Sequence, residues 1–405
     1  MTSAPAGLQA PLHLAVALDG AGWHPAAWRE ADAQPQRLFT AGYWTGLAQQ
    51  AERGLLDFLT IEDGLDLQSD DRFQADARLD RVRGRLDAVL IAARAAPATR
   101  HIGFVPTAIT THTEPFHLSK AIATLDYVSS GRAGIRVQVA VRAGTAAHFG
   151  RRESPPLRAD RLADPDVRRL IADHFDEAAD YVEVLRRLWD SWEDDAEIRD
   201  VSTGRFIDRN KLHYIEFEGR RFSVKGPSIT PRPPQGQPII AALGHATVPY
   251  QLIARSADVG FVTPRDAAHA AEIVAQIRTE QARAGRAAQT LHVFGDLVVF
   301  LDETRTAAIA RRQRLDERAG AEYRSDARVY AGTAAGLADL LQDWQAAGLS
   351  GFRLRPAALP HDLMHLTERL VPELQRRGLF RARYEADTLR GLLGLARPAN
   401  RYAAA

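Results

Sequence analysis

The sequence predicts an α/β protein in which eight parallel strands close into a (β/α)8 (TIM) barrel with insertions. Residues 118–128 carry apolar side chains at helical spacing and end at Ser129-Ser130-Gly131, where a helix commonly stops. A β-branched run at 135–139 follows almost at once, so this stretch is one step from helix to strand. Such steps recur along most of the chain, and neighbouring parallel strands need helical crossovers of this kind.

Short apolar runs mark the expected strands, and segments with a period of 3.6 residues mark the helices. A count of eight strands favours a closed barrel over an open, doubly wound sheet. The strands are expected at 12–18, 58–61, 102–107, 133–139, 239–242, 259–262, 291–300 and 351–354. The helices are expected at 43–54, 86–96, 118–128, 173–192, 248–256, 267–284, 303–322, 334–347 and 366–377.

The regular alternation breaks at about 142–236 and again at about 303–330. We therefore expect all 405 residues to form one domain with a long insertion and a second, helical insertion. Residues 143–169 are rich in Arg, Pro and Asp without a period, and 215–224 reads as a hairpin turning at Gly219. Long loops in compact domains are usually functional, so the first insertion is expected to cover the barrel mouth as a lid.

The composition excludes several classes of protein. The formal net charge of +1 gives no sign of a nucleic-acid partner, and no apolar run approaches the ~18 residues of a membrane span. Residues 1–11 lack the charged start and apolar run of a signal peptide, so we expect a cytoplasmic location. The absence of cysteine rules out a thiolate nucleophile, a disulfide and a cysteine-bound metal.

Polar residues follow several strands at the carboxyl end of the expected barrel, where the chemistry of such barrels takes place. Glu62 and Asp63 could form an acid/base pair, although adjacent residues of a strand face opposite sides. Arg136 is either a ligand for a cofactor anion or the partner of a carboxylate inside the barrel. The mouth is expected to be lined by residues 19–24, 62–63, 106–107, 138–139, 244–245 and 263–265 and by Arg355.

Two histidines, His361 and His365, have the spacing of two zinc ligands on a helix. The glutamate of a zinc-protease helix is absent, and Pro360 stands at the start of the segment. We therefore expect no metal site.

Segments spread over almost the whole chain together resemble one known family. They are Tyr43-Trp44-Thr45-Gly46-Leu47-Ala48, residues 58–64, Glu114-Pro115, Leu125-Asp126, Gly131-Arg132, residues 188–196, Gly226-Pro227, residues 231–238, Ala257-Asp258, residues 371–380, 388–390 and 393–395, Pro398 and Asn400. On these segments the chain is identified as a member of the bacterial luciferase-like flavin-dependent monooxygenases. Within them it resembles the branch that oxidises nitrilotriacetate, long-chain alkanes and dibenzothiophene sulfone.

The resemblance implies a two-component oxidoreductase with a TIM-like barrel. A separate flavin reductase would supply reduced FMN, which reacts with O2 at C4a, and the resulting peroxide would oxidise a small organic substrate. The flavin carries the hard chemistry and the protein positions it, so a dry cavity under a lid is expected. The resemblance also implies a homo-oligomer, either a dimer or a tetramer.

The resemblance also implies particular site residues. Asp63 and Thr107 correspond to the flavin-contacting Asp and Thr of the branch, and His24 lies in the loop that carries a proton donor. Further positions of its cofactor site are occupied here by Arg136 and Gln138 in the fourth strand, by His174 at the long helix, and by Gly244, His245 and Ala246 in the phosphate turn. Alternatively, His24 is a structural histidine of the loop that packs beside Trp23.

Four hydroxyl groups of the branch pattern are missing, at the positions of Val139, Ala140, Phe175 and Ala246. Each lost charge-assisted hydrogen bond at ~1.5–3 kcal/mol would weaken FMN binding, and Arg136, His174 and His245 could compensate. The departures leave a differently seated flavin, a weakly bound flavin or a homologue without flavin as alternatives. Two other functions also stay open, an F420-dependent oxidoreductase and a relative without redox chemistry.

The residues expected at the mouth mix aromatic and cationic side chains, with Trp23 and Phe149 beside Arg136, Arg265 and Arg355. This mixture predicts a partly apolar, anionic small molecule as the substrate.

Overall fold

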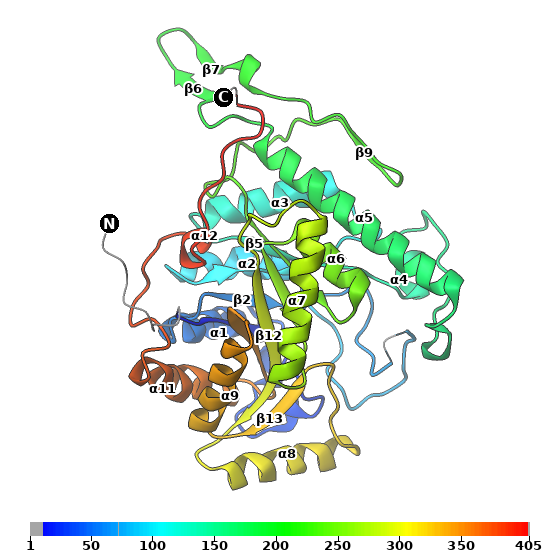
Figure 1. The fold of residues 1–405 in the computed structure, drawn as a ribbon, viewed down its shortest axis with the longest axis vertical. Coiled ribbons are helices and arrows are strands. Elements are labelled where there is room, and N and C mark those ends of the chain that lie inside the picture. The colour runs from blue at the N-terminus through cyan, green and yellow to red at the C-terminus, as the bar shows by residue number, and fades with distance from the viewer. Residues whose placement is uncertain (1–10, 72, 404–405) are drawn as a thin grey trace.

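A curled, parallel β-sheet with helices packed around it forms the body of the molecule (Figure 1). The computed structural model describes residues 11–71 and 73–403. The ten strands of the main sheet that it contains follow the order β3-β2-β1-β14-β12-β11-β10-β5-β4, with β13 paired to β12. They are β1 (His13–Leu18), β2 (Phe58–Ile61), β3 (Gly103–Phe104), β4 (Thr107–Ile109), β5 (Gly134–Gln138), β10 (Ile239–Gly244), β11 (Val259–Val262), β12 (His292–Leu301), β13 (Arg328–Gly332) and β14 (Gly351–Pro356).

The strand predicted at 102–107 is two short strands, β3 and β4, separated by Val105 and Pro106. Proline lacks the N–H group that a continuous ladder needs, although its carbonyl still accepts a bond of 2.9 Å from the Arg136 amide. β3 pairs with β2, and β4 pairs with β5. The two ends of the sheet order are therefore consecutive pieces of the chain, and a bridge between Phe104 and Ala133 joins them further.

The helices of the outer layer begin at the capping residues that the sequence provides. Thr40, Asp87, Asp266 and Thr333 each accept a hydrogen bond from a backbone N–H in the first turn of the helix that follows. The helices of this layer are α1 (Ala41–Arg53), α2 (Ala88–Ala95), α3 (Pro115–Val128), α6 (Thr247–Ser256), α7 (Ala267–Arg283), α9 (Ala334–Ala346), α10 (His361–His365) and α11 (Val371–Arg376). None of the helices in the described part of the chain is long and apolar enough to cross a membrane.

The long insertion contributes both a wall helix and a cover. α5 (Pro165–Asp190) starts earlier than predicted because Asp164 caps it and Pro165 occupies its first turn. It packs against α3 and α6, so most of this helix belongs to the outer layer. The predicted hairpin is confirmed as β8 (Phe217–Glu218) and β9 (Ser223–Val224), whereas the hairpin of β6 (Glu197–Asp200) and β7 (Arg205–Ile207) was not predicted.

The prediction also missed β13, which follows α8 (Arg305–Ala319) in the helical insertion. The long strand β12 makes this addition possible. Its first half pairs with β11, and its last residues, Leu297–Leu301, pair with β13 where β11 has already ended.

Candidate functional site

The interior of the curled sheet is layered along the strand direction. An apolar layer that includes Phe58, Phe261 and Phe294 fills the end at which the strands begin. Two residues further along β12 and β14 the inward positions become charged, with Asp296, Arg353 and Arg355 all buried. This order follows from the two-residue period of a strand, which keeps successive inward residues on one line.

The charged layer joins side chains of β5, β12 and β14 with Glu62, which follows β2, and Asp326, which precedes β13. Asp296 accepts hydrogen bonds from Nε of Arg353 at 3.0 Å and from Nε of Arg355 at 2.9 Å. Glu62 pairs with Arg136, and one of its oxygens lies 3.4 Å from Nη1 of Arg353. Arg355 also donates from Nη1 to Asp326 at 2.6 Å. Buried charges are tolerated only in such paired arrangements.

The pKa values of this layer follow from burial and pairing. Burial alone would raise the pKa of Asp296, but the charges of Arg353 and Arg355 more than offset it and hold the pKa below its ordinary value. Burial lowers the pKa of Arg136 to about 10, against the opposing effect of Glu62. Asp296 and Arg136 are therefore both ionised at neutral pH.

A cavity of about 450 Å³ lies directly above this layer, at the carboxyl ends of the strands. Arg136 and Gln138 line it, and Arg136 is the contact between the cavity and the charged layer, which we refer to as its floor. The remaining lining includes Asp63 to Ser69, Arg85, Ile109, Val137, Val139 to Arg142, Thr145, Phe175, Leu243, His245 and Leu252. The volume lies in the range of small-molecule and cofactor sites.

Asp63 and Glu62 have different surroundings, as the alternation within a strand requires. Glu62 is the residue that faces the charged layer. Asp63 lines the cavity and accepts hydrogen bonds from the backbone N–H groups of Gly64 at 2.7 Å and Ala88 at 2.9 Å. Burial raises the pKa of Asp63 above its ordinary value. Asp63 thus fixes the start of α2 to the cavity wall.

Arg136 forms an ion pair with the carboxylate of Glu62, which is one of its two predicted roles. Its Nε donates to Oγ1 of Thr107 at 2.9 Å, and its Nη2 donates to Oε1 of Gln138 at 2.8 Å. Thr107 is fully buried beneath the cavity and is not among its lining residues.

The predicted phosphate turn lies at the edge of the cavity, where β10 leads into α6. His245 lines the cavity, with Nδ1 3.0 Å from Oγ1 of Thr263 and Nε2 3.4 Å from Asp326. Ala246 is the N-cap of α6 and makes no side-chain cap. A Cβ on Gly244 would lie 2.8 Å from the Tyr250 ring, so glycine is required for this close approach.

Five predicted site residues do not line this cavity, namely Thr107, Gly244 and Ala246, described above, and His24 and His174. His174 is buried with its Nδ1 3.8 Å from Glu177, and Glu177 also receives two hydrogen bonds from Arg152. His24 is buried as well, with Nε2 3.0 Å from Asp316 and Nδ1 accepting from the amide of Ala26 at 3.1 Å. Burial lowers the pKa of His24.

A second cavity of about 380 Å³ adjoins the first and shares Gln68, Ser69 and Arg85 with it. Arg85 pairs with Asp19 at 2.6 Å between the two. Four arginines line this second cavity, namely Arg81, Arg83, Arg85 and Arg324, together with Trp23, Trp28 and Tyr323. These arginines were not predicted from the sequence, because the segment 64–86 that carries most of them has no period and no motif.

The charged floor, the two joined cavities and the parallel sheet together define an α/β-barrel enzyme that works at the carboxyl ends of its strands. Comparison with known proteins specifies the class. Residues 21–359 match the model of the luciferase-like monooxygenase family, and the chain belongs to that family. It is an enzyme of the flavin-dependent monooxygenase class, and the resemblance seen in the sequence is confirmed.

Individual relatives agree with this assignment over nearly the full length. The chain is 30% identical to the N-acetyl-S-(2-succino)cysteine monooxygenase of Bacillus subtilis and 30% identical to nitrilotriacetate monooxygenase component A of Aminobacter aminovorans. Each match covers 97% of this chain and 98% of the relative. Among solved structures, the long-chain alkane monooxygenase has a TM-score of 0.82 at 25% identity, covering 96% of both chains. A riboflavin lyase solved with modified FMN and riboflavin has the same TM-score and identity, covering 96% of this chain and 97% of its own. The TIM-barrel fold of this family is thereby established for the chain.

Proposed function

We propose that the protein is the oxygenase of a two-component system, which uses reduced FMN and O2 to oxidise a small anionic organic substrate. The observation that carries the proposal is the cavity of about 450 Å³ at the carboxyl ends of the strands, with a helix N-terminus at its edge. Family membership supports the use of flavin, and the riboflavin lyase solved with modified FMN supports FMN in particular.

The phosphate of FMN would be held where β10 meets α6. A helix N-terminus attracts anions because its first N–H groups lack partners in the helix. Ala246 supplies no side-chain cap, which leaves the amides of this turn for a ligand, and His245 stands beside them. Pro249 removes one amide of the turn, so the site offers fewer donors than the branch pattern.

The flavin ring would lie on the floor of the same cavity, against Arg136, Gln138 and Val139. The bound flavin supplies the reaction with O2, and the chain supplies position and exclusion of water. Asp63 holds the cavity wall rigid through its bonds to the start of α2. Thr145 and Arg142, from the first part of the long insertion, close the cavity against Asp66 and Leu67. We therefore propose that the insertion at 142–236 acts as the lid. Only its first part and Phe175 lie over the cavity.

The second cavity would hold the substrate. Arg81 and Arg83 are paired with nearby aspartates, and Arg85 is paired with Asp19. Arg324 is exposed, and no residue in the described part of the chain pairs with its side chain, so it can bind a carboxylate of the substrate. The names of the two relatives at 30% identity denote substrates with several carboxylates, which agrees with this choice.

The remaining parts of the proposal concern architecture and partners. β3 and β4 act as one strand, so the sheet forms an eight-stranded (β/α)8 barrel of β1, β2, β3/β4, β5, β10, β11, β12 and β14. The pairings on both sides of Val105 support this.

A flavin reductase delivers reduced FMN in the cytoplasm, and the oxygenase is a homo-oligomer. His24 and His174 support the walls of the site through their buried hydrogen bonds and ion pairs and do not touch flavin.

An anaerobic titration tests the flavin part of the proposal. Reduced FMN should bind saturably at micromolar concentration, measured by the change in flavin absorbance and fluorescence. Absence of binding up to the millimolar range would refute the proposal. The oxygenase part is tested by measuring O2 consumption in the presence of a flavin reductase, NADH and each of a panel of di- and tricarboxylates. One of these acids should be consumed, and the release of hydrogen peroxide should fall when it is present.

The substrate site is tested with a single arginine. Arg324→Ala should raise the KM for the acid about tenfold or more and leave reduced-FMN binding unchanged, because one charge-assisted bond at ~1.5–3 kcal/mol is lost. The matched control is Arg100→Ala, another exposed arginine, which lines neither cavity. An unchanged KM in Arg324→Ala would place the substrate elsewhere.

A further inference from the structure

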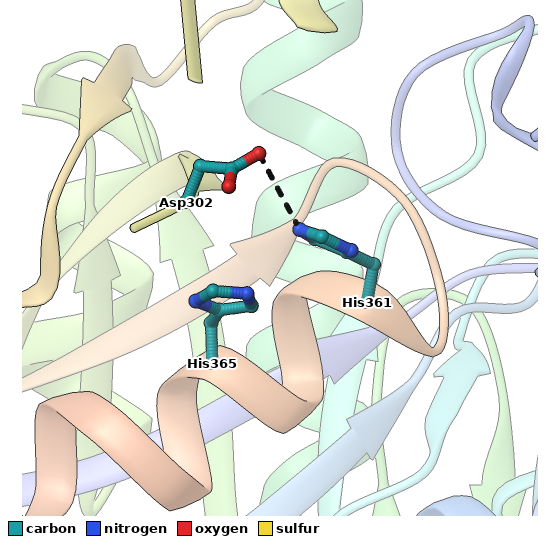
Figure 2. Close-up of side chains that lie close together, drawn as sticks. All are labelled: Asp302, His361 and His365. Atoms are coloured by element: carbon teal, nitrogen blue, oxygen red, sulfur yellow. Dashed lines mark ion pairs between the residues drawn. The ribbon is translucent and has the colours of Figure 1, made fainter. Parts of the chain in front are cut away.

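Three side chains of the types that bind transition metals converge beside the end of β12. Asp302 follows this strand directly, and His361 and His365 stand one turn apart on α10 (Figure 2). One ligand atom from each lies within 4.8 Å of the other two. Nε2 of His361 is 3.8 Å from Oδ2 of Asp302, and the two imidazole rings are stacked with centroids 4.6 Å apart. All three side chains point toward a common centre in Figure 2.

We propose that Asp302, His361 and His365 form a binding site for a divalent transition ion such as Zn²⁺, with water completing the coordination. Two imidazole nitrogens and a carboxylate oxygen are a common ligand set for zinc and for other first-row ions. With bonds of ~2.0–2.2 Å, the ligand atoms of a tetrahedral site lie ~3.3–3.6 Å apart. Rotation of the imidazole rings out of their stacked arrangement would bring the three ligand atoms to these separations around an ion.

A buried carboxylate holds α10 against the end of β12 and thereby sets the position of the ligands. Asp362 is fully buried and accepts from the amides of Leu301 at 2.8 Å and Ala358 at 2.8 Å. Arg311 pairs with the same carboxylate. Rigid support of this kind keeps ligands near the bound geometry and lowers the cost of ordering them when the ion binds.

The ligand nitrogens are available for an ion. In the described part of the chain, His365 has no hydrogen-bond partner for either ring nitrogen, and its contact is the stacked ring of His361. Nδ1 of His361 lies 3.9 Å from Oδ2 of Asp32. A carboxylate in this position commonly orients a histidine that binds a metal through its other ring nitrogen. Nε2 of His361 lies 3.1 Å from the carbonyl oxygen of Leu301. When the ion binds this nitrogen, the carbonyl oxygen still accepts a hydrogen bond of 3.0 Å from Arg311.

The local charge favours a cation despite one nearby arginine. Nε of Arg311 lies 3.7 Å from Oδ2 of Asp302, but the charge of Arg311 is balanced by Asp362. Asp302 and Asp32 then leave a negative balance beside the two imidazoles, and the neutral imidazole is the form of histidine that binds metals. None of the three ligands lines either cavity, so the site is separate from the proposed oxygenase chemistry. The ion would tie the end of β12 to α10 and stabilise this side of the barrel.

Metal titration of the tag-free, chelator-treated protein tests the proposal. One equivalent of Co²⁺ should bind and produce visible d–d absorption, and Zn²⁺ should abolish this absorption by displacing Co²⁺. At Zn²⁺ concentrations about 100-fold above Kd the melting temperature should rise by a few degrees. His365→Gln and Asp302→Asn should each weaken binding at least tenfold, whereas His117→Gln, at an exposed histidine on α3, should bind as the wild type does.

Two results would overturn the proposal. One is a wild-type protein that binds less than one equivalent of Co²⁺ and of Zn²⁺ at millimolar concentration, which needs no variant to interpret. The other is a folded His365→Gln or Asp302→Asn protein, judged by circular dichroism, that binds the ion as tightly as the His117→Gln control.

Discussion

Replacement of Asp296 by asparagine tests whether the charged layer is held together by its carboxylates. Asp296 is fully buried and receives hydrogen bonds from both Arg353 and Arg355. In Asp296→Asn one carboxylate oxygen becomes an NH2 group, which faces guanidinium donors and cannot accept. The loss of about two charge-assisted bonds at ~1.5–3 kcal/mol each corresponds to ~3–6 kcal/mol. Measured losses for breaking buried ion pairs are ~3–5 kcal/mol, so we expect a loss of about 4 kcal/mol.

Urea unfolding followed by tryptophan fluorescence measures this effect, and a matched substitution controls for it. Asp160→Asn removes the same charge from an exposed pair with Arg158, whose side chains are 67% and 64% exposed. An exposed pair contributes ~0–1 kcal/mol, so the unfolding midpoint of this control should hardly move. If Asp296→Asn lowered the free energy of unfolding by no more than the control does, the buried charges would not stabilise the barrel and the floor of the cavity would need another explanation.

Three further outcomes are expected. Phe175→Tyr and Ala246→Ser restore hydroxyl groups at the predicted flavin site, and each should tighten reduced-FMN binding up to about tenfold in the anaerobic titration, while Ala246→Gly should not. Gly244→Ala puts a Cβ 2.8 Å from the Tyr250 ring, so it should displace the start of α6 and weaken FMN binding about tenfold. The control is Gly46→Ala, which has no atom within 4 Å of the added Cβ and should leave FMN binding unchanged. Burial raises the pKa of Asp126 to about 6, so the folded state holds this proton more tightly than the unfolded state. Its contribution to stability is complete below pH ~3.9 and is lost as the pH rises through 6, which should cost about 3 kcal/mol by pH 7 relative to Asp126→Asn in pH-dependent urea unfolding. Equal pH profiles for the two proteins would contradict this assignment.

The sequence predicted most of the strands because each is a short apolar run ending in turn residues. β11 agrees with its predicted range residue for residue, and β12 is shifted by one residue. β13 was missed because its apolar residues, Val329 to Ala331, form a run of only three between Arg328, which is exposed, and Gly332. The split at Pro106 was missed because a proline at one position of an apolar run does not tell whether the strand ends or only loses a bond there.

The site was predicted less well, for a reason that lies in the barrel itself. Both faces of β2 are buried, so its apolar pattern cannot tell which of Glu62 and Asp63 points inward. Arg136 was predicted with two alternatives, and the sequence could not show that its carboxylate neighbour is Glu62. Asp302 could not be linked to His361 and His365 at all, since no spacing rule joins a residue after β12 to a helix that follows β14.

The charged layer has a consequence for what the cavity can bind. Glu62, Asp296 and Asp326 match Arg136, Arg353 and Arg355 in number, so the floor carries no excess charge toward a ligand above it. Of the three arginines that the sequence suggested for an anionic substrate, Arg136 and Arg355 are therefore already neutralised, and Arg265 lines neither cavity. Attraction of an anion must come from the rim, where Arg324 lies at the second cavity and the α6 N-terminus lies at the first. In the proposed function, the flavin phosphate and the substrate carboxylate would therefore occupy different cavities, which share Arg85.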